Sequence, residues 1–285
     1  MSEPTASSDQ DVPPFVAPAW VASRRDRVRL VDCRWSLDGS QGREQYLDAH
    51  VTGAVHADLD RDLASTPSAQ GGRHPLPTPA HFAAAMRRLG IDDDTVVVAH
   101  DTAGGVVAAR LVWMLRILGH PAAVLDGPAD QLGWGTTSGP EDVAPGTFTT
   151  TPWPLEDLAD IDEVAAAADG LAPDRVVVDA RDPRRHRGEF EPVDPRAGRI
   201  PGSRNVPVSS LGDDGRLPPP DDLRARFDAV GLAGPGRDVV WSCGSGVTAC
   251  HGALAMEQAG LPRPRVFVGS YSAWSSDPAR PVERG

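Results

Sequence analysis

Short apolar runs alternate with longer amphipathic segments along the chain. Four of the runs are rich in valine and end close to turn residues: 28–32, 95–99, 175–179 and 239–243. Runs of this length and composition are typical of strands that are buried on both faces of a parallel sheet. Between them, residues 81–90 place Phe82, Met86 and Leu89 on one face of a helix. The pattern therefore predicts an α/β fold in which strands alternate with helices.

The same order of elements occurs twice. Four landmarks of the first half have counterparts 142 to 149 positions later: Asp32 and Asp179, Gly53 and Gly202, Asp101 and Cys243, Gly127 and Gly269. A nearly constant offset over several landmarks indicates a duplicated domain. We predict an N-terminal domain over residues 13–135 and a C-terminal domain over 158–285, joined by a linker over 136–157 that carries no periodicity. Residues 1–12 are polar and are expected to form a disordered tail.

Composition narrows the class of protein. A formal net charge of −12 over 285 residues argues against nucleic acid or an anionic membrane as a partner, although a local arginine cluster can still attract a small anion. No apolar stretch is long enough for a membrane span and the first residues lack a signal-peptide pattern, so we expect a soluble cytoplasmic protein. Cys33, Cys243 and Cys250 show neither disulfide nor metal-site spacing, and we expect reduced thiols and no metal.

The segment around Cys243 carries the candidate chemistry. The strand at 239–243 passes through a glycine-rich loop into a helix that extends to Gly260. The backbone amides of such a loop and of the first helical turn have no internal acceptor, so they favour an anion, here the thiolate of Cys243. Gly244 and Gly246 suit a loop that curls its amides to one side. A buried cysteine at a strand end, followed by two turn glycines, is the alternative interpretation.

The first half differs at the position that matches the cysteine. Asp101 stands there, and a carboxylate cannot act as a soft nucleophile. We therefore expect the C-terminal domain alone to carry the chemistry. The N-terminal domain is expected to pack against it and to close the pocket.

These features together resemble those of the two-domain rhodanese sulfurtransferases over residues 14–280. The resemblance rests on the duplicated halves, the loop from Cys243 to Ala249, the turn Arg199-Ile-Pro-Gly202, and the paired strand-end residues Asp32 and Asp179. It implies an α/β fold of tandem duplicated rhodanese-like domains, each a mostly parallel sheet flanked by helices. It also implies that Cys243 takes a sulfur atom from a small anionic donor, becomes a persulfide and passes the sulfur to a thiol or to cyanide, without a cofactor.

The loop sequence Cys-Gly-Ser-Gly-Val-Thr is similar to that of the 3-mercaptopyruvate sulfurtransferase branch of this family. Thiosulfate-specific members tend to carry basic residues just after the cysteine. The persulfide is then expected to be held by the amides from Gly244 to Thr248, including those of Gly246 and Val247. Thr248 either directs its hydroxyl toward the sulfur or acts only as a helix-entry residue.

Six arginines follow the strand that ends at Asp179, and a donor that bears a carboxylate needs such planar cations. In the family, the first substrate arginine precedes an aromatic-x-Gly sequence, which points to Arg185. The second follows an acidic, proline-containing stretch, which points to Arg196. The gap between them is longer than the family pattern, so Arg187 and Arg199 are alternatives. A solvated loop charge is the other interpretation of each arginine.

The resemblance also implies a polar group of three residues that polarises the substrate: Ser245, His74 and Asp60. A serine hydroxyl in reach of a carbonyl can stabilise the enolate that forms when sulfur leaves, and a histidine can set its proton. The alternative is that His74 only caps a loop and that Ser245 is a small residue that the turn tolerates.

Two other functions of the same fold make different demands on the loop of Cys243. A cysteine phosphatase requires an arginine six residues after its nucleophile, where this chain has Ala249. A persulfide carrier would keep Cys243 without turning over. Turnover with 3-mercaptopyruvate and with thiosulfate, each with cyanide as acceptor, distinguishes the two donors from one another and from the carrier.

Overall fold

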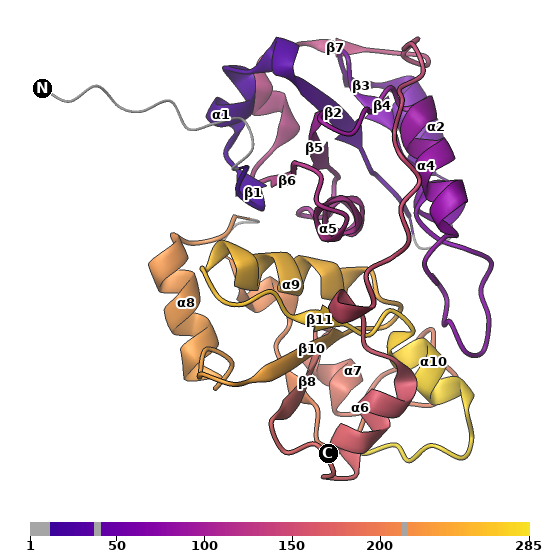
Figure 1. Cartoon of the computed structure of the whole chain (residues 1–285), viewed down its shortest axis with the longest axis vertical. Coiled ribbons are helices and arrows are strands. Elements are labelled where there is room, and N and C mark those ends of the chain that lie inside the picture. Colours follow the sequence, from indigo (N-terminus) through magenta and orange to yellow (C-terminus); the bar gives the residue numbers. More distant parts are fainter. Residues whose placement is uncertain (1–11, 37–40, 213–215) are drawn as a thin grey trace, which may run out of the picture.

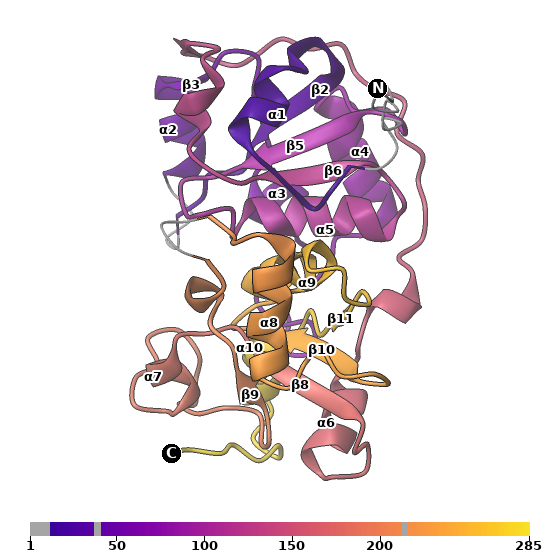
Figure 2. The same ribbon diagram turned by 90° about the vertical axis from the view of Figure 1, so that its left-hand side faces the viewer.

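The computed structural model describes residues 12–36, 41–212 and 216–285. Two α/β domains are stacked along the long axis of the molecule, with the N-terminal domain above the C-terminal domain in Figure 1. Figure 2 shows that one helix of each domain lies along the boundary between them. Within the described ranges, no helix is long and apolar enough to cross a membrane.

The N-terminal domain is built on a parallel sheet of five strands in the order β1-β6-β5-β2-β4. Their bounds are Phe15–Val16 (β1), Val28–Asp32 (β2), Val55–His56 (β4), Val96–His100 (β5) and Ala122–Leu125 (β6). Every residue of β5 is buried, as the continuous apolar run predicts for a central parallel strand. A separate antiparallel pair joins His50–Val51 (β3) to Thr136–Thr137 (β7).

Among the described residues, five α-helices and two short 3-10 segments surround this sheet. The α-helices are Pro18–Ala22 (α1), Gly42–Asp48 (α2), Leu59–Asp62 (α3), Pro79–Arg88 (α4) and Ala108–Ile117 (α5), and the 3-10 segments are Arg25–Arg27 (η1) and Ala129–Leu132 (η2). The helix predicted over 81–90 corresponds to α4, which begins two residues earlier. Thr78 caps it by accepting the amide of His81, and proline occupies its first turn.

The C-terminal domain repeats this arrangement. Its four parallel strands have the order β11-β10-β8-β9, with bounds Arg175–Asp179 (β8), Arg204–Asn205 (β9), Asp238–Ser242 (β10) and Arg265–Val266 (β11). This order corresponds strand by strand to β6-β5-β2-β4 of the first sheet. Its helices are Ile161–Ala168 (α6), Pro183–His186 (α7), Pro220–Ala229 (α8), Thr248–Gln258 (α9) and Ser270–Ser276 (α10), with 3-10 segments at Leu155–Asp157 (η3) and Val208–Ser210 (η4). The predicted duplication of an α/β domain is confirmed.

The two domains meet where α5 packs on α9 (Figures 1 and 2). Nine of the ten residues of α5 are buried, because one side of the helix covers its own sheet and the other covers α9. Trp113 of α5 and Trp241 of β10 belong to one continuous apolar core. An ion pair between Arg116 and Glu257 closes the edge of this contact. Because the core runs through both domains, their relative placement is fixed by packing.

The predicted linker packs along the N-terminal domain. Phe148 is buried, and the hydroxyls of Thr147 and Thr149 donate to the carboxylates of Asp92 and Asp93. The segment descends beside the upper domain before it enters the lower one (Figure 1). Val12, which the sequence assigns to the tail, is also buried. Residues 1–11 of the predicted tail lie outside the described residues.

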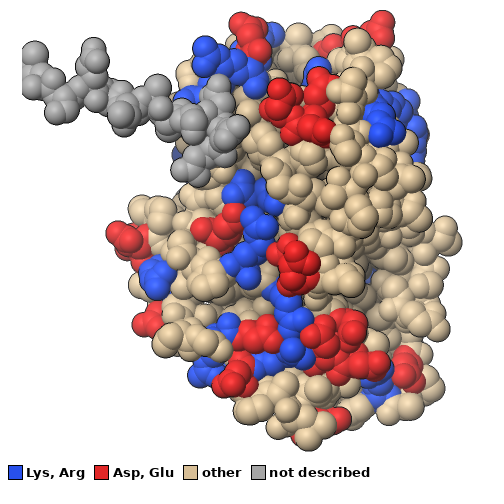
Figure 3. Space-filling view, in the orientation of Figure 1, with Lys and Arg blue, Asp and Glu red and all other residues tan. Residues whose placement is uncertain are grey.

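Charged side chains of both signs alternate on the face shown in Figure 3. In the C-terminal domain, Arg175 and Arg265 share the carboxylates of Glu163 and Asp238. These pairs tie strands β8, β10 and β11 to α6. A partly exposed network of this kind fixes orientation more than it adds stability.

Candidate active site

Cys243 lies directly after β10 and begins the loop that leads into α9. Its side chain is buried, and the backbone amide of Gly246 donates to its Sγ at 3.1 Å. Gly246 has φ of +77°, and a Cβ there would collide with the carbonyl of Val268. Any other residue would therefore be strained at this position and would also lack space. Glycine is what lets the loop turn its amide toward the sulfur.

Ser270 supports the loop from behind. Its hydroxyl accepts the amide of Cys243 at 3.0 Å and donates to the carbonyl of Phe267 at 2.9 Å. With φ of +52°, Ser270 is the one non-glycine residue in the left-handed region within the described ranges. Such a conformation costs free energy and persists where surrounding contacts demand it. The strained backbone of Ser270 thus positions the nucleophile.

The matching loop of the N-terminal domain shows what this turn binds. Both carboxylate oxygens of Asp101 accept backbone amides at 2.7 to 2.9 Å, from Ala103, Gly105, Val107 and Ala108. A short loop followed by a helix therefore forms a ring of donors around an anion, as expected for orphan amides. In the C-terminal loop, the side chain in the corresponding position is the sulfur of Cys243.

Ser245, His74 and Asp60 are brought together across the domain boundary. The Oγ of Ser245 is 2.9 Å from His74 Nδ1, and His74 Nε2 is 3.1 Å from an oxygen of Asp60. The other oxygen of Asp60 accepts the indole N–H of Trp35 at 2.8 Å. Burial lowers the pKa of His74, and the nearby cations Arg110 and Arg73 act in the same direction, against Asp60. The ring is therefore neutral at pH 7.

Arg110 links the loop of Cys243 to the loop of His74. Its guanidinium is fully buried and donates to the carbonyls of Gly246 at 3.2 Å and His74 at 3.1 Å. One cation of the N-terminal domain thus holds both the cysteine loop and the histidine loop. The sequence does not point to Arg110, because a single arginine in an apolar helix does not reveal which distant carbonyls it will bond.

Arg185 and Arg73 flank the start of the loop. A Cβ built on Gly244 would lie 2.8 Å from Arg73 Nη2 and 3.6 Å from the terminal nitrogens of Arg185. Both guanidinium groups bond the carboxylate of Asp194, which is buried between them. Burial raises the pKa of Asp194, while the two cations act in the opposite direction. Arg185 also donates to Glu191 at 2.6 Å.

The structure does not bring Arg196 or Arg187 to this cavity. The guanidinium of Arg196 donates to four carbonyls at and after the end of α10: those of Trp274, Ser275, Asp277 and Arg280. It satisfies acceptors that the helix leaves unpaired. Arg187 is exposed and pairs with Glu189, and Arg199 pairs with Glu283. The second arginine beside Gly244 is therefore Arg73, whereas the sequence pattern points to Arg196.

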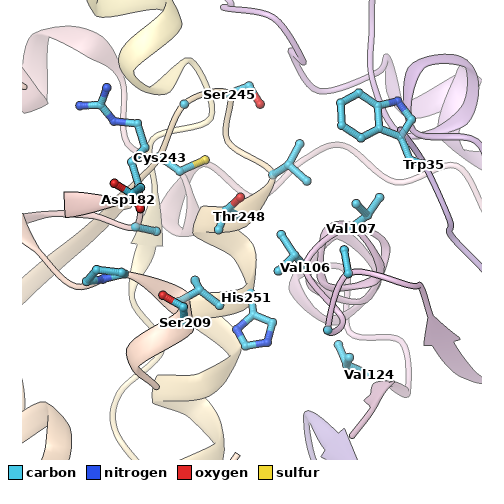
Figure 4. Close-up of a pocket in the computed structure, with 18 of the residues that line it drawn as sticks. Trp35, Val106, Val107, Val124, Asp182, Ser209, Cys243, Ser245, Thr248 and His251 are labelled. Carbon is cyan, nitrogen blue, oxygen red and sulfur yellow. The ribbon is translucent and has the colours of Figure 1, made fainter. Parts of the chain in front are cut away.

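A cavity of about 680 Å³ opens between the domains in front of Cys243. Its wall includes five of the residues predicted around the sulfur, together with His74 and Arg185: Cys243, Gly244, Ser245, Val247 and Thr248. Figure 4 shows Cys243, Ser245 and Thr248 on one side, opposite Trp35, Val106 and Val107 of the N-terminal domain. The cavity thus combines a nucleophile, two cations and a neutral histidine.

Several proteins of similar sequence are sulfurtransferases by name. A family model described as the rhodanese-like domain matches residues 17–130 and 160–277. The chain is 42% identical to a probable 3-mercaptopyruvate sulfurtransferase of Pseudomonas aeruginosa, over 90% of this chain and 92% of that one. It is 39% identical to a putative thiosulfate sulfurtransferase of Mycobacterium tuberculosis, over 91% and 92% of the two chains.

The solved structure of the Escherichia coli 3-mercaptopyruvate sulfotransferase SseA superimposes with a TM-score of 0.78 at 29% identity, over 92% of this chain and 100% of that one. The chain therefore belongs to the rhodanese family, as two tandem domains. It is a sulfurtransferase, and the predictions of family, fold and enzyme class are confirmed.

Proposed function

We propose that this chain takes sulfur from 3-mercaptopyruvate, holds it as a persulfide on Cys243, and passes it to a thiol or to cyanide. The observation that carries this choice of donor is the contact of Ser245 with His74, backed by Asp60, at the mouth of the cysteine loop. Such a group suits a donor whose carbonyl becomes an enolate. The names of the Pseudomonas aeruginosa and Escherichia coli relatives support the same donor.

Binding of the donor follows from its charges. Arg73 and Arg185 lie beside Gly244, where a carboxylate would replace part of their contact with Asp194. Planar guanidinium groups bind a carboxylate through parallel hydrogen bonds. This end of the cavity would hold the carboxylate and leave the sulfur of the donor toward Cys243.

The transfer conserves atoms and electrons. The Cys243 thiolate attacks the donor sulfur, a sulfur–sulfur bond forms, and the carbon–sulfur bond breaks with its electron pair on the carbon. The resulting pyruvate enolate has charge on its oxygen, where the hydroxyl of Ser245 can donate, and it becomes pyruvate after it gains a proton on carbon. The amide of Gly246, 3.1 Å from Sγ, supports a negative charge on sulfur.

Thiosulfate is the second candidate donor, because the Mycobacterium tuberculosis relative is named for it and because two arginines also suit a sulfonate. The deciding experiment measures kcat/KM for each donor with cyanide as acceptor. We expect 3-mercaptopyruvate to be preferred at least tenfold. Faster turnover of thiosulfate contradicts the proposal, and no turnover of either donor favours a persulfide carrier.

A further inference from the structure

The cavity continues beyond the nucleophile into an apolar region, here called the far lobe. Its wall is formed by six apolar side chains together with His251: Phe15, Val106, Val107, Val124, Leu125 and Val208. In Figure 4, Cys243 and Ser245 lie at one end of the pocket, while His251, Ser209 and Val124 lie at the other. The far lobe is therefore part of the same cavity as Cys243 and Ser245 and extends away from them toward His251.

His251 gives the far lobe one polar group without a partner. The residue is buried, its ring packs edge-on against Phe15 with centroids 5.0 Å apart, and its Nδ1 has no hydrogen bond within the described residues. Its other contact is with the backbone of Gly104. A buried polar atom that lacks a partner costs roughly 1–3 kcal/mol, and Nδ1 itself is buried rather than open to the cavity, so His251 contributes its ring faces and edges to the wall.

The far lobe is close to neutral. Burial lowers the pKa of His251 to about 4, although Asp101 acts in the opposite direction, so the ring is uncharged at pH 7. Asp126 and Arg216 line the cavity and offset one another, whereas Asp182 lies at the end near Cys243 (Figure 4). A cavity of about 680 Å³ also exceeds what a donor of a few atoms fills, since pockets of about 300–1,000 Å³ hold drug-sized ligands.

We propose that the far lobe binds the acceptor, and that it selects a small thiol whose body is uncharged and apolar. This inference rests on the proposed persulfide of Cys243. The acceptor thiol loses its proton, its sulfur bonds to the outer persulfide sulfur, and the old sulfur–sulfur bond breaks. The electron pair returns to Cys243, and the product is the hydropersulfide of the acceptor.

A matched pair of acceptors tests the charge preference. The enzyme is first loaded with 3-mercaptopyruvate and then reacted with 3-mercaptopropionate or with its methyl ester, and rates are corrected for the thiolate fraction of each. We expect kcat/KM for the ester to exceed that for the anion at least tenfold. Equal rates, or a faster anion, overturn the inference.

A variant that fills the far lobe tests the location. Val106→Trp does this from a half-buried position. For Val106→Trp we expect kcat/KM for the ester to fall at least tenfold, and to fall much less for cyanide, which needs no such space. Val230→Phe, at an exposed position outside the cavity, is the matched control.

The two proposals fail in different ways. Mass spectrometry of the enzyme treated with donor alone shows whether Cys243 gains one sulfur atom. If it does not, the proposed function is wrong. If it does, but neither the ester preference nor the selective effect of Val106→Trp is found, the far lobe is not the acceptor site. Should Val106→Trp fail to fold, Val106→Lys supplies the same test, with an expected shift in favour of the anionic acceptor.

Discussion

At the scale of single residues, the site depends on what surrounds Gly244. The guanidinium groups of Arg73 and Arg185 approach Gly244 from different domains, and both donate to the carboxylate of Asp194 between them. The sequence points to Cys243 and Arg185 because both lie in local motifs, and the structure places both on one cavity. It does not point to Arg73, which reaches the cavity only through the packing of one domain on the other. It also points to Arg196, whose guanidinium bonds carbonyls near the end of α10, because order along the chain does not reveal which carbonyls a guanidinium will bond.

Replacement of the nucleophile tests the residue scale most directly. Cys243→Ser should abolish sulfur transfer while leaving the thermal unfolding transition almost unchanged, because serine has nearly the same shape. Cys250→Ala is the control: burial raises the pKa of Cys250 to about 12, so it stays a thiol and bonds the carbonyl of Gly246. Activity retained in Cys243→Ser would remove this residue from the mechanism.

The two arginines should act on donor binding. Charge-assisted hydrogen bonds contribute about 1.5–3 kcal/mol, so Arg73→Ala or Arg185→Ala should raise KM for 3-mercaptopyruvate roughly 10- to 150-fold. Steady-state kinetics with cyanide as acceptor provide the measurement. Arg187→Ala, at an exposed position, should have no effect. An unchanged KM in Arg73→Ala would return the role of second arginine to another residue.

At the scale of elements, valine-rich runs predicted β2, β5, β8 and β10 because strands buried on both faces need no polar alternation. The sequence did not identify β1, β3, β4, β7 or β9, each of two residues, since so short a strand has no periodicity to read. The apparently unstructured segment after residue 136 packs on the domain through isolated contacts, such as those of Phe148 and Thr147.

Helix α9 contains Gly252, although glycine has a low intrinsic helix propensity. A Cβ on Gly252 would collide with the ring of Trp241, so this helix approaches its sheet more closely than alanine allows. Propensity alone predicts that Gly252→Ala stabilises the protein by about 1 kcal/mol, whereas overpacking costs about 1–3 kcal/mol. We expect the free energy of unfolding in urea to decrease. An increase would show that the contact relaxes without cost.

At the scale of the whole molecule, neither domain contains a complete site. His74, Asp60, Arg73 and Arg110 come from the first domain, while the sulfur and Arg185 come from the second. The shared apolar core holds these parts in register. A change at the boundary between α5 and α9 should therefore alter catalysis as well as stability.

Buried histidines make the stability of the whole molecule depend on pH. Burial lowers the pKa of five of them: His56, His74, His100, His186 and His251. The histidines of the unfolded chain gain protons near pH 6.5, whereas those of the folded chain gain them only at lower pH. The unfolded state therefore binds more protons below pH 6.5, and the free energy of unfolding falls as the pH decreases from that value. Urea unfolding between pH 7 and 5 should show this loss.

Three carboxyl groups have a raised pKa and therefore oppose this loss of stability at low pH: Asp126, Asp157 and Asp194. Comparing the unchanged chain with a His251 variant isolates the effect of one histidine. Between pH 6 and 5, His251 remains neutral in the folded state but is mostly charged in the unfolded state. His251→Phe should therefore reduce the slope of unfolding free energy against pH by roughly 1 kcal/mol per unit. An identical slope in both chains would contradict the burial of a neutral ring.

Asp101 supplies its own turn with a permanent negative charge, whereas the corresponding turn of the second domain holds the sulfur of Cys243. Because Asp101 satisfies its amides, the first turn has a structural role: Ala103, Gly104, Val106 and Val107 form part of the cavity in front of Cys243. A substitution in this turn should therefore change the shape of the cavity, and with it the acceptor that fits, while the loop of Cys243 keeps its own residues.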